Sequence, residues 1–230
     1  FITAAYILIP AKENRETSIE RFSAIYSNCG FMGIPLVDAI FGFEGVFYLT
    51  AFITTFNLFV WTHGVILISG EKQLKNIAKI FYSPVIISIA LGIIMFFFQI
   101  RTPENPTKAL DFIASLNTPL AMIVSGVTIA DTNVIALIKK VRIYYICLLK
   151  LILIPVVVTV IFAFFNINEC VRLTVIIAAS APSAAMCTLQ CIKYNKNSLY
   201  ASEIFAATTI LSVIALPFIV KFDNLVCNFI

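Results

Sequence analysis

The stretch IYSNCGFMGIPLVDAIFG (residues 25–42) interrupts an apolar run that is long enough to cross a bilayer. Gly30 and Gly33 permit unusual backbone angles, and Pro35 cannot donate a helical hydrogen bond. A break in a membrane helix leaves backbone N–H and C=O groups that need partners inside the protein or in a water-filled cavity. The stretch therefore predicts a functional site within the membrane. The alternative is a simple kink between packed helices.

The composition places the chain in a membrane. Of its 230 residues 60% are hydrophobic and 12% are charged, with a mean hydropathy of +0.99, whereas a soluble domain carries about twice that charge fraction. The apolar runs are continuous and lack the alternation of barrel strands, which predicts an all-α polytopic membrane protein. The expected membrane segments cover residues 1–11 (truncated), 19–42, 46–69, 81–100, 108–130, 142–165, 171–192 and 199–222.

The lysines and arginines between these segments predict the orientation. Alternate joints face the same side of the membrane. One side receives eleven basic residues: Lys12, Arg15, Arg21, Lys72, Lys75, Lys79, Lys139, Lys140, Arg142, Lys193 and Lys196. The other side receives four, namely Arg101, Lys108, Arg172 and Lys221. Because basic residues accumulate on the cytoplasmic side, we expect the C-terminus to lie outside the cytoplasm of a cell (plasma or inner) membrane.

A second interrupted segment predicts an inverted repeat. AASAPSAAM (residues 178–186) lies within segment 171–192, and Pro182 follows Pro35 by 147 residues. Residues 1–69 are then the end of a first repeat, 70–80 a cytoplasmic linker and 81–230 a complete second repeat of five helices. Five is odd, so the two repeats have opposite orientations, and roughly 70 residues of the first lie upstream.

The two breaks predict a binding site for an anion. We expect the first segment to unwind near 28–34 and restart at Pro35, and the second to unwind near 178–181 and restart at Pro182. Each restarted helix then directs its electropositive N-terminus toward the bilayer midplane, a geometry suited to a carboxylate. We expect side-chain hydrogen bonds from Asn28 and Ser183, with Ser180 or Thr188 within reach.

Three further polar residues lie inside apolar segments. Lys150 is either a counter-ion or gate for the substrate or a snorkelling side chain at the cytoplasmic interface. Asn117 either lines the pathway or forms a hydrogen bond between helices. Asp38 either carries a coupling proton or complements the dipole of the restarted helix, and the dipole role is favoured.

The stretches SNCGFMGIPL (27–36), TFNLFVWTHGVIL (55–67), SLNTPLAMIVSGVTIA (115–130) and APSAAMCTLQCIKYNKNSLYASEIFAATTILSVIALP (181–217) resemble the auxin efflux carrier family, which includes bacterial malate or malonate permeases. The resemblance implies ten helices in two inverted five-helix repeats, of which this chain holds helices three to ten. It implies crossing prolines at Pro35 and Pro182 and a substrate-binding asparagine at Asn28. Plant members have a second asparagine where this chain has only Ser183, which argues against auxin as the substrate.

These features predict a secondary transporter that moves an organic anion, such as a dicarboxylate or an auxin-like carboxylate, by alternating access. The expected partners are that anion and the lipid bilayer, with no nucleic acid, and a homodimer through the scaffold helices is left open. The motifs of metalloproteases, serine hydrolases and ATP-hydrolysing enzymes are missing from the sequence, so we expect no enzyme, no cofactor and no metal. Two alternatives remain: a sodium-coupled carrier of the bile-acid symporter type, and a membrane scaffold or sensor subunit without transport.

Overall fold

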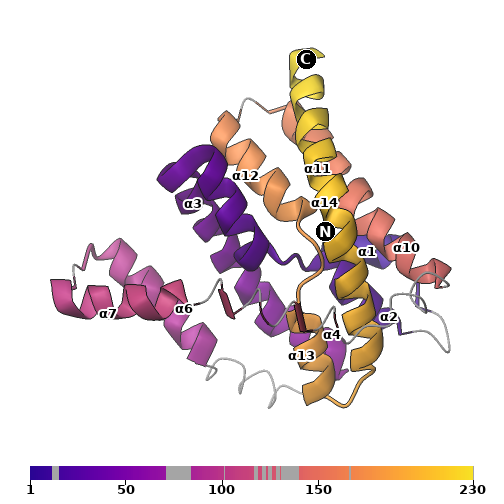
Figure 1. Ribbon diagram of the computed structural model, residues 1–230, viewed down its shortest axis with the longest axis horizontal. Helices are drawn as coiled ribbons and strands as arrows, with labels where there is room; N and C mark the ends of the chain where they lie inside the picture. The colour runs from indigo at the N-terminus through magenta and orange to yellow at the C-terminus, as the bar shows by residue number, and fades with distance from the viewer. Residues whose placement is uncertain are drawn as a thin grey trace.

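The computed structural model describes residues 1–11, 16–70, 84–100, 102–116, 140–165 and 167–229, together with 119–120, 123, 126–127 and 130. Across these residues the chain is helical, and its one element of β-pairing is an isolated bridge. Most helices pack into one bundle, and two stand to its side (Figure 1). The all-α prediction is thereby confirmed.

The first part of the chain forms a helical hairpin interrupted at its start. It contains α1 (Ile2–Leu8), α2 (Thr17–Ile25), the π-helix η1 (Cys29–Gly33), α3 (Ile34–Phe59), the π-helix η2 (Val60–Gly64) and α4 (Val65–Ser69). The chain reverses inside α3 at Gly42, whose φ of 59° and ψ of −147° are not helical. A Cβ on Gly45 would lie 2.6 Å from Phe41 Cβ, so only glycine fits this turn. The predicted joint between segments 19–42 and 46–69 is therefore correct.

The second part forms the remaining helices. In chain order these are α6 (Pro84–Phe97), α7 (Glu104–Ser115), α10 (Val141–Leu148), the π-helix η3 (Leu149–Leu153), α11 (Ile154–Ala163), α12 (Glu169–Ser180), α13 (Met186–Lys193) and α14 (Ser198–Phe229). Among the described residues, three stretches are long and apolar enough to cross a membrane: Cys29–Ser69, Val141–Ala163 and Ser198–Val226. The first is 41 residues long, which at about 1.5 Å per residue is twice a bilayer core, as its reversal at Gly42 requires.

The last helix is longer than predicted. The sequence predicts an end at residue 222, whereas α14 continues to Phe229. Asp223 is fully buried and accepts a hydrogen bond from Arg172 Nε of α12 at 3.2 Å. Because the buried carboxylate is paired with a guanidinium group, the helix can continue past it.

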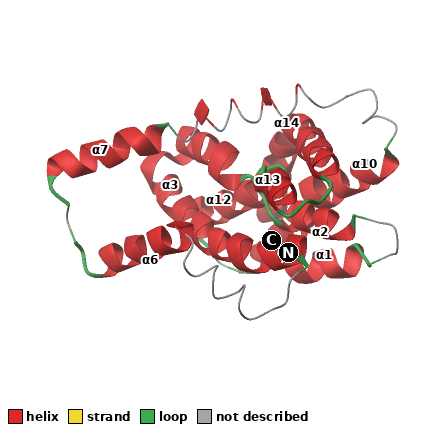
Figure 2. Ribbon diagram, turned by 90° about the horizontal axis from the view of Figure 1, so that it is seen from below, coloured by secondary structure: helices red, strands yellow, loops and turns green. Residues whose placement is uncertain are grey.

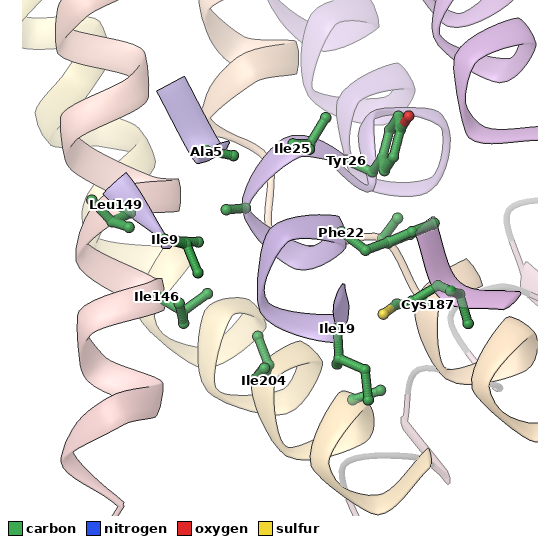
Figure 3. Packing of buried hydrophobic residues seen from close by; sticks show 14 of the residues in the cluster. Ala5, Ile9, Ile19, Phe22, Ile25, Tyr26, Ile146, Leu149, Cys187 and Ile204 are labelled. Carbon is green, nitrogen blue, oxygen red and sulfur yellow. The ribbon is translucent and has the colours of Figure 1, made fainter. Parts of the chain in front are cut away.

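The core of the bundle surrounds α2. Ile19, Phe22 and Ile25 of α2 are almost fully buried and meet side chains from α1, α10, η3, α13 and α14 (Figure 3). A second cluster joins α12 to the hairpin of η1 and α3 and includes Leu49 and Ile177. Elements from both ends of the chain thus enclose α2 and the residues that follow it.

Helices α6 and α7 lie apart from this bundle in both views (Figures 1 and 2). No described side chain of α7 is buried, and those of α6 are exposed except for half-buried Met95. The aromatic contact between α6 and the bundle joins Phe96 to Phe47 of α3, with ring centroids 6.4 Å apart.

Candidate functional site

The two interrupted segments meet and pair through their backbones. Ser27, which follows α2, and Ser183, which follows α12, form an antiparallel bridge. Asn28 N donates to the carbonyl oxygen of Pro182 at 2.7 Å, and Ala184 N donates to that of Tyr26 at 2.9 Å. Each unwound strand therefore supplies partners for backbone groups that the other strand's break exposes.

The breaks lie at positions different from those predicted. In the first segment the residues outside the helices are Tyr26 to Asn28, and the chain is helical again from Cys29, not from Pro35. In the second, α12 runs to Ser180 and the helix restarts at Met186, not at Pro182. The predictions used the positions of the prolines, whereas pairing between the strands fixes the unwound residues.

A π-helical turn explains how Pro35 fits inside the restarted helix. Proline has no N–H, and its ring crowds the carbonyl four residues earlier. The wider turn η1 precedes Pro35, and η3 precedes Pro155 in the same way. Local π-helical adjustments of this kind let membrane helices accommodate proline and often occur at functional sites.

The place where residues 26–28 and 182–184 pair is called the crossing below. A cavity of about 420 Å³ opens beside it. The first residues of both restarted helices line it: Asn28, Cys29, Gly30 and Phe31 from the first, and Ala184, Ala185 and Met186 from the second. The backbone N–H groups of Phe31 and Met186 donate to no backbone carbonyl among the described residues, whereas that of Gly30 bonds the Cys29 thiol. Two helix N-termini with unused donors thus face one cavity, which favours an anionic ligand.

Asn28 is the side chain best placed to contact a ligand. It is 5% exposed and lines the cavity, and its amide Nδ2 has no hydrogen-bond partner in the described part of the chain. The hydroxyl of Ser183 is also buried without a partner, while its backbone N–H donates to Thr208 Oγ1 at 3.1 Å. Leaving such groups unpaired costs stability, so a ligand or water that accepts from Asn28 is favoured.

Lys150 lies directly behind the crossing. Its side chain is 1% exposed, and Nζ donates to Ser27 Oγ at 2.5 Å. Among the residues that the structure describes, no carboxylate pairs with it. This position argues against snorkelling to the interface, whereas the counter-ion role remains a prediction.

The charge of Lys150 complements helix ends of the opposite sign. Ser27, its partner, follows the C-terminus of α2 and donates to the carbonyl of Ala179 in the last turn of α12 at 3.4 Å. The C-terminal ends of helices carry negative partial charge, which a nearby cation stabilises. With those ends compensated by Lys150, the two helix N-termini leave the cavity electropositive.

The structure places the other predicted residues outside the cavity. Gly33 packs against Leu49, Pro35 and Asp38 are exposed on α3, and Ser180 donates its hydroxyl to the carbonyl of Ile176 in its own helix. Thr188 is half-buried on α13 and does not line the cavity either. Asn117 lies outside the described residues.

Three residues that lie at the cavity or the crossing are not identified from the sequence. Ser27 connects Lys150 to the cavity, and its position next to Asn28 was a usable signal. Asn57 lines the opposite wall and stands as a single amide in an apolar run. Thr208 caps Ser183 N–H, and no pattern in the sequence points to it. Within the described ranges, no group of three or more His, Cys, Asp or Glu side chains could hold a metal ion.

Comparison with known proteins matches the chain to a membrane transport family and to a transporter. A family model described as "Membrane transport protein" matches residues 1–77 and 73–220. An "Uncharacterized transporter" of Methanothermobacter thermautotrophicus (strain Delta H) is 26% identical over 209 residues, which are 85% of this chain and 64% of that protein. The chain thus spans less than two thirds of the length of this relative. No solved structure matches the chain significantly.

Proposed function

Because the chain belongs to the membrane transport protein family, which comprises the auxin efflux carriers, we propose that it moves a small organic anion across the membrane by alternating access. The main support is the cavity at the crossing, where two restarted helices present unpaired backbone N–H groups and the Asn28 amide to the same space. Buried Lys150 brings a basic side chain up against Ser27 on the side away from the cavity. Together these groups suit a carboxylate, which accepts several hydrogen bonds and needs a counter-charge.

The separation of the two parts of the molecule supports a moving bundle. The crossing strands, Lys150 and Thr208 are joined by hydrogen bonds and share one packed core. Helices α6 and α7 lie beside this core (Figure 2), and among the described residues Phe96 of α6 contacts Phe47 of α3. In the proposed mechanism the bundle shifts as a unit against α6 and α7, which opens the cavity alternately to the two sides.

Uptake measurements on the full-length protein in proteoliposomes test this function. Malonate and related dicarboxylates should enter the vesicles with saturation, whereas the uncharged diamide malonamide should not, because it lacks the charge that the site complements. Equal uptake of malonamide would contradict an anion site. A lack of flux for every carboxylate, together with no thermal stabilisation by any of them, would favour the scaffold or sensor alternative.

The sodium-coupled alternative makes a different prediction in the same assay. A carrier of the bile-acid symporter type should lose uptake when Na⁺ is replaced by K⁺. We expect uptake to persist, since the fixed cation Lys150 already compensates the helix C-termini at the crossing.

The proposed orientation places the C-terminus outside the cytoplasm of the cell membrane. Its support is the excess of lysine and arginine on alternate joints, which include Arg21, Lys140 and Lys196. A single cysteine introduced at exposed Lys196 of a cysteine-free variant should be labelled by an impermeant maleimide only after the membrane is opened. Labelling in intact cells would reverse the orientation.

A further inference from the structure

His63 is the single histidine of the sequence, and it lies in the π-helical turn η2 beside the crossing. Its Nδ1 is 2.8 Å from the hydroxyl oxygen of Tyr26, and its Nε2 is 3.4 Å from that of Tyr6. The Tyr26 hydroxyl is also 2.9 Å from the carbonyl oxygen of Phe59, to which it can donate. Both ring nitrogens therefore face hydroxyl oxygens, which can either donate or accept.

This arrangement satisfies the imidazole in both protonation states. In the charged form, Nδ1–H donates to Tyr26, Nε2–H donates to Tyr6, and Tyr26 donates its own proton to Phe59 O. In the neutral form with the proton on Nδ1, the Tyr6 hydroxyl turns and donates to Nε2. The imidazole can thus bind or release a proton when one hydroxyl rotates. That hydroxyl belongs to Tyr6, whose side chain is 41% exposed at the surface of the bundle.

Close packing connects this pair of tyrosines to the crossing. Tyr26 is 1% exposed, and its carbonyl accepts the backbone bond from Ala184 that holds the two unwound strands together. A Cβ on Gly64, next to His63, would lie 2.7 Å from Phe22 and 3.2 Å from Tyr26, so the histidine turn lies directly against α2. Val60, at the start of the same turn, lines the cavity.

The ionisable neighbours are few. Tyr6 of α1 and Tyr26 face the ring, Arg21 of α2 lies over the outer face of Tyr6 at 4.2 Å from the ring centroid, and from α13 the thiols of Cys187 and Cys191 share the buried cluster with Tyr26. No ion pair joins His63 to a carboxylate in the described part of the chain. Arg21 opposes the charged imidazole, and an anion in the cavity would favour it.

We propose that His63 is a proton-binding site of this carrier, and that a proton on His63 strengthens the binding of a carboxylate at the crossing. The inference rests on the proposed function. Histidine titrates in the physiological range, and the ring contacts Tyr26, whose neighbour Ser27 lines the cavity. Two opposite charges about 10 to 15 Å apart at an intermediate dielectric change affinity on the order of tenfold. Anion binding at neutral pH should therefore be accompanied by proton uptake.

Calorimetric titration of malonate into the full-length carrier in nanodiscs, from about pH 6 to pH 8, tests the proposal. Wild type should bind malonate about tenfold more tightly at the acid end. His63→Gln should bind with the affinity that wild type has at the alkaline end, and its affinity should change with pH only through the titration of malonate itself. Thr62→Ala is the matched control, because Thr62 lies in the same turn and donates its hydroxyl only to Leu58 O of its own helix. It should keep the wild-type profile, and the titration of malonate itself is common to all variants.

If His63→Gln fails to fold, a second variant, Tyr6→Phe, and NMR spectra of the wild-type histidines still test the proposal. Tyr6→Phe removes the acceptor for Nε2–H at an exposed position and should move the pH dependence to lower pH. In ¹⁵N-histidine spectra the signals lost in His63→Gln should titrate in wild type, and malonate should shift that titration to higher pH. The same pH dependence in wild type and His63→Gln overturns the inference but leaves the proposed function intact. An absence of malonate binding to wild type at every pH contradicts both.

Discussion

The bundle around the crossing and the pair α6–α7 differ in where their polar side chains lie. The bundle contains every buried polar or charged side chain of the described residues, among them Glu20, Lys150 and Asp223. In α6 and α7 no described side chain is buried, and the ion pair Lys108–Glu104 lies on the surface. Large apolar side chains such as Phe97 and Phe112 are 75% exposed there, as suits contact with hydrocarbon.

This difference indicates which part of the chain contributes most to the free energy of unfolding and which part can form the binding site. Buried polar groups are costly unless they are paired, and they specify one arrangement of their helices. The bundle therefore has a defined internal geometry that can hold a binding site. Helices α6 and α7 instead expose most of their side chains. Substitutions of the same chemical type should have large effects in the bundle and small effects in α6–α7.

The largest difference should come from breaking an ion pair in each region. Glu20 is 2% exposed and accepts two hydrogen bonds from Arg142, at 2.8 and 2.6 Å. Arg142→Met leaves this carboxylate buried with only the Tyr200 hydroxyl as a partner, so it should lower the free energy of unfolding by about 3–5 kcal/mol. Lys108→Met breaks an exposed pair and should cost at most about 0.5 kcal/mol. Unfolding monitored by intrinsic fluorescence measures both, and equal losses would refute the distinction.

Truncation of an apolar side chain should give the next largest contrast. Ile146 of α10 is fully buried in the cluster around α2 (Figure 3), and Ile146→Ala should cost about 2–4 kcal/mol through lost contacts and a cavity. Phe112→Ala on α7 removes a larger side chain that is 75% exposed, and it should cost less than about 1 kcal/mol. A comparable loss for Phe112→Ala would show that α7 packs against protein.

Within the bundle, Lys150→Met should separate binding from stability. The substitution removes the charge behind Ser27, so malonate affinity should fall on the order of a hundredfold. The thermal midpoint should stay the same or rise, because an apolar side chain is easier to bury than an ammonium group. Exposed Lys193→Met on α13 is the control and should change neither quantity. Unchanged malonate affinity in Lys150→Met would restrict Lys150 to a structural role.

The smallest effect should come from Asn28→Ala. Loss of one side-chain hydrogen bond costs about 1 kcal/mol, which corresponds to a roughly fivefold weaker affinity for malonate. Membrane insertion and expression should remain normal, because Nδ2 of Asn28 forms no hydrogen bond with another described residue. Asn224→Ala at the exposed end of α14 is the matched control. Normal malonate affinity and uptake in Asn28→Ala would remove Asn28 from the site.

Sequence patterns predicted the helical segments well because apolar runs and charged joints report directly on burial in lipid. The turn at Gly42, the start of α14 and the two interrupted segments were all recognised from glycine, proline and charge. The residues that unwind were misplaced by several positions. Proline marks where a helix can start, but the pairing of Ser27 with Ser183 decides where it does.

The connections within the site could not be read from one sequence. The bond from Lys150 to Ser27 joins residues 123 positions apart, and that from Ser183 N to Thr208 depends on the packing of α14 against the second break. The contact of His63 with Tyr6 and Tyr26 likewise needs three helices to assemble. Such contacts depend on tertiary structure, which local patterns do not encode.

A cryo-electron microscopy map of the full-length carrier with bound malonate tests the central claim most directly. The account predicts density for the dicarboxylate in the cavity between the first turns of η1 and α13, within hydrogen-bond distance of the Asn28 amide. Malonate held between other helices, or continuous helices through residues 26–28 and 181–184, would contradict it.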